Sequence, residues 1–209
     1  MKKTGRVLCL NSLKLDFLMK LDRVRASLCI LSAAGLLTGI LLFSVKNSSF
    51  DIAKTVFGAI FKFKTGDNFA IAFLIASGIF LSVILLQIIF GSSVFGVIVV
   101  PLSAFSINCI FGMTLAYSYN TYKLSGLAFN SILLIPTFAI FLFGFIVSSS
   151  ALLNYSICQL KNLSKKRNSK DNADFSAMLK KQLFASLIML FNALLEVILN
   201  HIFIANFNF

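Results

Sequence analysis

Five long runs of apolar residues decide which class of structure this sequence can form. A helix needs about 20 predominantly apolar residues to cross the hydrocarbon core of a bilayer. Five runs meet that length: residues 27–45, 68–90, 94–117, 126–157 and 182–205. The chain is 58% hydrophobic, and a water-soluble protein of 209 residues has too little interior to bury so much apolar surface. The sequence therefore excludes a soluble enzyme, a disordered chain and a disulfide scaffold. It predicts an all-α polytopic membrane protein, a five-helix transmembrane bundle forming a single integral membrane domain over residues 1–209.

The fourth run, residues 126–157, is longer than one perpendicular crossing requires, because a helix rises about 1.5 Å per residue. We expect the excess to be taken up by tilt, by a kink at Pro136, or by an extension past Ala151 into the cytoplasm. Dividing the run at Pro136 leaves 10 residues before the proline, too few for a separate crossing. Five crossings are therefore favoured over six.

Lysine and arginine are distributed unevenly among the connecting segments. Residues 1–25 hold seven and residues 158–181 hold seven, whereas 46–67 hold four and 118–125 hold one. Because cytoplasmic loops carry the excess of basic residues, the N-terminus is predicted to be cytoplasmic and the C-terminus outside. The net charge of +12 then reflects topology and attraction to anionic lipid headgroups rather than binding to nucleic acid.

Two basic segments outside the runs have patterns of their own. In residues 1–25, apolar side chains from Leu10 to Val24 recur at helical spacing between charged ones, which predicts a cytoplasmic amphipathic helix at the membrane surface. A soluble tail is the alternative. Residues 158–181 predict a cytoplasmic basic loop, which either fixes topology or binds a cytoplasmic partner.

The third run carries small residues at a spacing of four. Ala104, Asn108, Gly112 and Ala116 therefore lie on one face of a helix, where small side chains let two helix backbones approach closely. We favour packing inside the bundle for this face. The alternative is a contact with a second copy of the chain, which would make the protein a homo-oligomer.

The fifth run carries a polar stripe, formed by Asn192, Glu196 and Asn200. Glu196 is the one charged residue inside the predicted crossings, and a carboxylate at mid-membrane costs roughly 2.5 to 3.5 kcal/mol on insertion scales. The stripe should therefore face protein or a wet cavity. Either it handles protons or cations, or Glu196 is hydrogen-bonded and holds the last helix against Asn108 or Gln87.

Sequence motifs of enzymes are missing from the chain. It has no phosphate-binding loop, no G-x-S-x-G and no H-E-x-x-H. We therefore expect no catalytic residues, no metal site and no cofactor. One Glu and one His on the last helix do not make a base–nucleophile set, because no third group orients them.

The segment from residue 101 to 136 reads PLSAFSINCIFGMTLAYSYNTYKLSGLAFNSILLIP. In this segment and in the order of its parts, the chain resembles the stage II sporulation protein M family. The matching positions are Pro101, Gly112, Thr114, Gly126, Leu127 and Pro136, and Glu196 matches an acidic residue frequent in the last helix of the family. Asn108 and Phe138 depart from the pattern, since the family has Gly and Asn at those places.

This resemblance implies a membrane anchor. It suggests a non-enzymatic scaffold that recruits membrane or wall-associated proteins, in particular peptidoglycan hydrolases, at the plasma membrane. The alternative is a small transporter or the membrane subunit of an exporter. Glu196, its two neighbouring asparagines and the two prolines motivate that alternative, because interrupted helices and buried acids line substrate paths.

Overall fold

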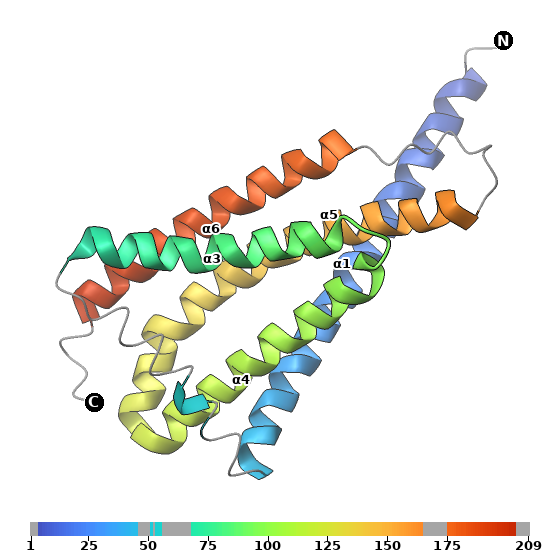
Figure 1. The fold of residues 1–209 in the computed structure, drawn as a ribbon. Helices are drawn as coiled ribbons and strands as arrows, with labels where there is room; N and C mark the ends of the chain where they lie inside the picture. Colours follow the sequence, from blue (N-terminus) through green and yellow to red (C-terminus); the bar gives the residue numbers. More distant parts are fainter. Residues whose placement is uncertain (1–3, 46–50, 52, 56–67, 165–174, 204–209) are drawn as a thin grey trace.

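A computed structural model describes the chain outside residues 1–3, 46–50, 52, 56–67, 165–174 and 204–209, with backbone alone for residues 4–22 (Figure 1). Its long elements are all helices, and no strand occurs in the described part. They are α1 (Thr4–Val45), α3 (Phe69–Gly91), α4 (Gly96–Phe129), the π-helical turn η1 (Asn130–Leu134), α5 (Ile135–Ser164) and α6 (Phe175–Phe203). The predicted all-helical class is therefore confirmed for these residues.

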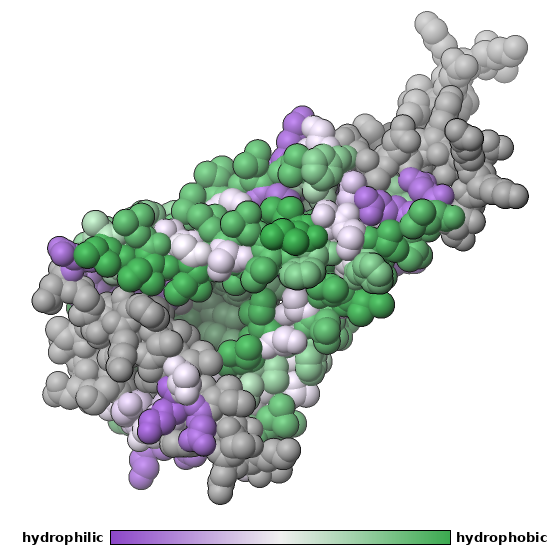
Figure 2. Space-filling view, viewed as in Figure 1, coloured by the Kyte–Doolittle hydropathy of each residue, from purple (hydrophilic) through white to green (hydrophobic). Residues whose placement is uncertain are grey.

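Four helical stretches are long and apolar enough to cross a membrane. They are Arg23–Ser44, Phe69–Gly91, Gly96–Leu163 and Phe175–Phe203. Large apolar side chains are exposed along them, among them Ile30, Leu74 and Leu102, and Figure 2 shows apolar surface along the length of the bundle. Such exposure is unfavourable in water and favourable in lipid. The chain is thus a multi-pass membrane protein.

The stretch Gly96–Leu163 reverses its direction at Lys123. The backbone there leaves helical geometry, with φ 50° and ψ −115°. Beyond the reversal, a Cβ on Gly126 would meet the carbonyl oxygen of Ser118, so only glycine fits this close approach. Asn130 closes the turn, since its Nδ2 donates to the Leu115 carbonyl at 3.2 Å and its Oδ1 accepts from the Ser118 hydroxyl at 2.6 Å. The two arms form a helical hairpin (Figure 1).

A π-helical turn directly precedes Pro136, where the sequence predicts a kink. η1 spans Asn130–Leu134 and α5 begins at the next residue. Proline removes a backbone donor, and a π-turn is one way in which a helix accommodates that loss. The Thr137 hydroxyl donates to the carbonyls of Leu133 and Leu134, at 2.8 and 3.1 Å. α5 then continues past Ala151 to Ser164.

Helix α1 is continuous from Thr4 to Val45, so no break separates the basic N-terminal segment from the apolar one. Its first turns project beyond the other helices in Figure 1. The side chains of the predicted amphipathic face lie outside the described residues, except at its C-terminal end. The amphipathic character of residues 1–25 therefore stays a prediction.

A buried polar network joins α3, α5 and α6. The Ser148 hydroxyl lies 2.9 Å from Gln87 Oε1 and 2.7 Å from Gln182 Oε1. Gln87 Nε2 donates to the Ser149 hydroxyl at 2.9 Å, and Gln182 Nε2 to the Ser148 carbonyl at 3.0 Å. Because unpaired amides are costly in an apolar interior, this network fixes the three helices in one register.

Exposed basic side chains gather at one end of the bundle. α1 and α6 enter there and α5 leaves it, and Val24 packs on the same apolar cluster as Leu152 and Met178. The basic residues at this end are Arg23, Arg25, Lys161, Lys180 and Lys181. The described basic residues at the opposite end, near the hairpin turn, are Lys54 and Lys123, with His201 at the end of α6. The bundle is therefore polarised in charge along its axis.

Candidate functional site: a cavity that ends at Glu196

The small-residue face of α4 packs against α1. Ala104 and Asn108 are each 1% exposed, Gly112 is buried and Ala116 is half-buried. A Cβ on Gly112 would meet the backbone of α1 at Leu36, and a Cβ on Gly35 would lie 2.5 Å from the Phe105 carbonyl oxygen. The two backbones are thus in direct contact, and this face is buried inside the chain.

The partner motif on α1 was missed by the sequence analysis. Gly35 and Gly39 form a G-x-x-x-G pair, and a Cβ on Gly39 would meet the backbone at Cys109. Ser32, one turn earlier, is also buried. This spacing is a known signal of close helix packing in membranes, so the α1 face could have been predicted from the sequence.

The amides proposed as partners of Glu196 bond elsewhere. Asn108 Nδ2 donates to the carbonyl of Ala104 in its own helix, at 2.6 Å. Gln87 belongs to the serine network of α5 and α6. Whether Glu196 holds α6 against one of these two amides therefore stays a prediction.

The polar stripe of α6 faces inward. Asn192 is fully buried, Asn200 is 4% exposed and Glu196 is 8% exposed. Among the described residues, neither side-chain polar atom of Asn192 has a hydrogen-bond partner, nor does Nδ2 of Asn200. The burial of these three polar side chains on one face of α6 fits the expectation that they avoid lipid.

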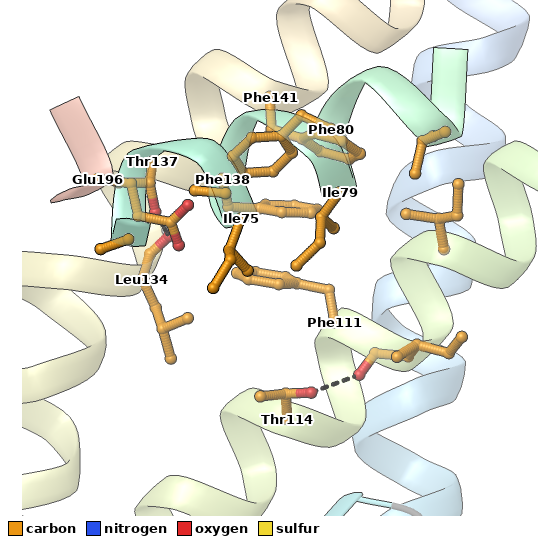
Figure 3. A pocket seen from close by; sticks show the side chains of 15 residues that line it. Ile75, Ile79, Phe80, Phe111, Thr114, Leu134, Thr137, Phe138, Phe141 and Glu196 are labelled. Atoms are coloured by element: carbon orange, nitrogen blue, oxygen red, sulfur yellow. Dashed lines mark hydrogen bonds between the residues drawn. The ribbon is translucent and has the colours of Figure 1, made fainter. Parts of the chain in front are cut away.

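A cavity of about 340 Å³ lies among α3, α4 and α5, and Glu196 of α6 lines it at one side (Figure 3). Figure 2 shows the surface hollowed between α3 and α4. The lining is Ala72, Ile75, Ala76, Ile79, Phe80, Val83, Ile107, Ile110, Phe111, Thr114, Leu134, Thr137, Phe138, Phe141 and Glu196. Glu196 is the charged member of this set. In Figure 3 its carboxylate points toward Thr137 and Leu134.

Aromatic rings form one wall of the cavity. Phe111 of α4 and Phe138 of α5 stack with their planes 5° from parallel. Phe141 extends the wall, with its ring centroid 5.5 Å from that of Phe80 and 5.9 Å from that of Phe138. The rings come from α3, α4 and α5, so the wall exists only when these helices are assembled (Figure 3).

Comparisons with protein-family models, curated proteins and solved structures found no match for this chain. In the described part, no group of three or more His, Cys, Asp or Glu side chains could hold a metal ion. The chemistry that the geometry presents is therefore that of an apolar cavity with one carboxylate at its edge. Fifteen lining residues from α3, η1 and three other helices contribute to it, which explains why no sequence motif marked it.

Proposed function

We propose that the chain crosses a bacterial plasma membrane five times and serves as a non-enzymatic anchor. Its N-terminus would be cytoplasmic and its C-terminus outside. In this role it holds peptidoglycan hydrolases at the membrane, as the resemblance to the stage II sporulation protein M family implies.

The role of the resembling residues in the α4–α5 hairpin carries this proposal. Gly112 lets α4 touch the backbone of α1, and Gly126 lets the second arm of the hairpin touch the first at Ser118. Pro136 follows the π-turn directly, and Thr114 lines the cavity. Positions that match the family pattern thus form close backbone contacts, adjoin the π-turn or line the cavity. These roles support the proposed resemblance over the hairpin.

The crossing number and the orientation have separate support. Gly96–Leu163 contains 68 residues, about 100 Å of helix, whereas the hydrocarbon core is about 30 Å thick. Its reversal at Lys123 supports a division into two crossings, which would bring the proposed total to five. The basic end of the bundle belongs in the cytoplasm by the positive-inside rule.

Recovery of partners from native membranes tests the anchor role. The full chain, solubilised in mild detergent, should co-purify with a cell-wall hydrolase. Gly126→Ala should lose this partner, because the added methyl group forces the hairpin arms apart. Gly78→Ala is the matched control, since a Cβ at Gly78 meets nothing within 4 Å, and it should retain the partner.

The anchor proposal fails if the unaltered chain recovers no wall hydrolase and a strain lacking the gene remodels its wall normally. Retention of the partner in both glycine variants would instead show that the hairpin contact is irrelevant to recruitment.

One observation favours a second candidate, a small transporter or the membrane subunit of an exporter. The cavity places a carboxylate at the edge of an apolar space between helices, where transport proteins position substrate groups. Glu196→Gln should then abolish transport in cells or vesicles. Unchanged flux in that variant would exclude transport through this cavity.

A further inference from the structure

Every polar side chain among the described lining residues of the cavity already has a partner. These side chains are Thr114, Thr137 and Glu196. The Thr114 hydroxyl donates to the Ile110 carbonyl at 2.9 Å, and the Thr137 hydroxyl donates to backbone carbonyls of η1. Glu196 is engaged in an interaction within the chain as well. A ligand therefore needs no charged or hydrogen-bonding group to occupy this space.

The remainder of the lining is apolar and does not suit water. Twelve of the fifteen lining side chains are alanine, valine, leucine, isoleucine or phenylalanine. A buried water molecule needs about two to four polar partners, so cavities with apolar walls stay dry. Empty space is also costly, because the side chains at the wall lose dispersion contacts on one side. We therefore expect apolar matter to fill this cavity of about 340 Å³.

The cavity opens sideways between α3 and α4, about halfway along both helices (Figure 2). Two of its lining residues form the rim, since Ile79 of α3 is 50% exposed and Ile110 of α4 is 41% exposed. Ile79 lies 10 residues from the first residue of α3 and 12 from the last, about 15 and 18 Å along the helix. The hydrocarbon core is about 30 Å thick, so the opening faces lipid tails rather than headgroups.

We propose that this cavity holds one acyl chain of a membrane phospholipid, which enters between Ile79 and Ile110 and lies against the aromatic wall. The α3 part of the lining runs from Ala72 to Val83, about 16 Å along the helix, and one leaflet of the hydrocarbon core is about 15 Å deep. The cavity thus has the length of a single lipid tail. This site goes beyond the anchor role and requires no transport, so it stands whether or not the chain recruits a hydrolase.

A site for the tail predicts which part of the lipid decides binding. Phosphatidylcholine, whose headgroup is neutral overall, should be held as firmly as an anionic lipid with the same tails, because the headgroup stays outside the cavity. A lipid held by the basic end of the bundle would instead have to be anionic, since the lysine and arginine side chains there attract negative headgroups.

Native mass spectrometry of the full-length chain, released from nanodiscs that contain phosphatidylcholine and phosphatidylglycerol in equal amounts, tests this prediction. At collision energies that remove loosely held lipid, we expect the chain to keep one molecule of phosphatidylcholine. Retention of phosphatidylglycerol alone would place the bound lipid at the headgroups and overturn the proposal. A bare chain, or a chain that keeps a second copy in place of lipid, would overturn it too.

Two double variants assign the retained lipid to the cavity. Ile79→Trp combined with Ile110→Trp narrows the opening from both sides, and the retained phosphatidylcholine should be lost. Leu74→Trp combined with Leu102→Trp is the matched control, because both leucines are exposed on the same two helices and neither lines the cavity. The control should keep the lipid. Retention of the lipid by the rim variant contradicts the site.

A measurement on the unaltered chain keeps the test decisive if the rim variant does not fold. Phosphatidylcholine with a photoreactive diazirine at the end of one tail should label Phe141, as mapped by peptide mass spectrometry. Phe141 lines the cavity and is buried, so lipid that merely surrounds the bundle does not reach it. Labelling confined to exposed side chains such as Leu74 and Leu102 refutes the proposed position of the tail.

Discussion

Replacing Gly35 by alanine should separate the two most closely packed helices of the bundle. An added Cβ would lie 2.5 Å from the Phe105 carbonyl oxygen and 3.2 Å from Asn108 Cβ. Ordinary van der Waals contact begins at about 3.4 Å, so α1 must move from α4 by about 0.9 Å. We call the close contact between α1 and α4 the seam. A shift of that size weakens the dispersion contacts along the whole seam, since a gap of about 0.5–1 Å forfeits a quarter to a half of each contact.

The expected cost follows from comparison with a glycine that has free space. Overpacking of a close contact costs about 1–3 kcal/mol, whereas alanine in a helix interior gains about 0.5–1 kcal/mol over glycine. Gly78→Ala should show only the stabilisation by alanine, because its Cβ meets nothing within 4 Å. The difference in free energy of unfolding between the two variants therefore isolates the seam, and it should be about 1–3 kcal/mol.

Reversible unfolding in mixed micelles measures this difference. Far-UV ellipticity suits the chain better than intrinsic tryptophan fluorescence, because the sequence contains no tryptophan. Gly35→Ala should unfold at a lower fraction of denaturing detergent than the unaltered chain, and Gly78→Ala at the same fraction or a higher one. If the two variants unfold together, the backbones of α1 and α4 are not in contact and the seam described here is wrong.

Further expected outcomes concern the polar contacts and the orientation of the bundle. Gln87→Leu should lower the free energy of unfolding by about 1–3 kcal/mol, because its serine partners on α5 lose a buried hydrogen-bonding group; an unchanged stability would argue against the network. Ser156→Ala should cost about 1 kcal/mol in the same titration, since the hydroxyl accounts for hydrogen bonds to the backbone between α3 and α4, including the Gly91 carbonyl. In a background without cysteine, Lys123→Cys should react with an impermeant maleimide on intact cells, and Lys180→Cys only after permeabilisation. The opposite labelling pattern would show that the proposed orientation in the membrane is wrong.

The sequence determined the class of structure but not the partners of its helices. Long apolar runs define helices in lipid because every backbone polar group must be satisfied within the segment, so the all-helical class was predictable. The α4 face of Ala104, Asn108 and Gly112 was also predictable from its spacing. Its partner face on α1 carries Gly35 and Gly39, but spacing alone does not say which of several small-residue faces pack against each other.

The cavity and the π-turn were beyond sequence reasoning for a physical reason. A kink near Pro136 follows from the missing backbone donor, but whether the helix bends or widens into a π-turn depends on packing around Asn130 and Thr137. The cavity depends on how α3, α4 and α5 diverge, which is set by contacts far apart in the chain. Glu196 could be singled out from the sequence because a carboxylate inside the membrane is energetically costly. Nothing in the sequence singled out the aromatic wall beside it.

The turn at Lys123 ties the two arms of the hairpin to each other. Ser118 and Gly126 touch across it, so a side chain at position 126, or extra residues between these two positions, would have to open the contact. Lengthening the connection between Ser118 and Gly126 should therefore let the two arms move independently.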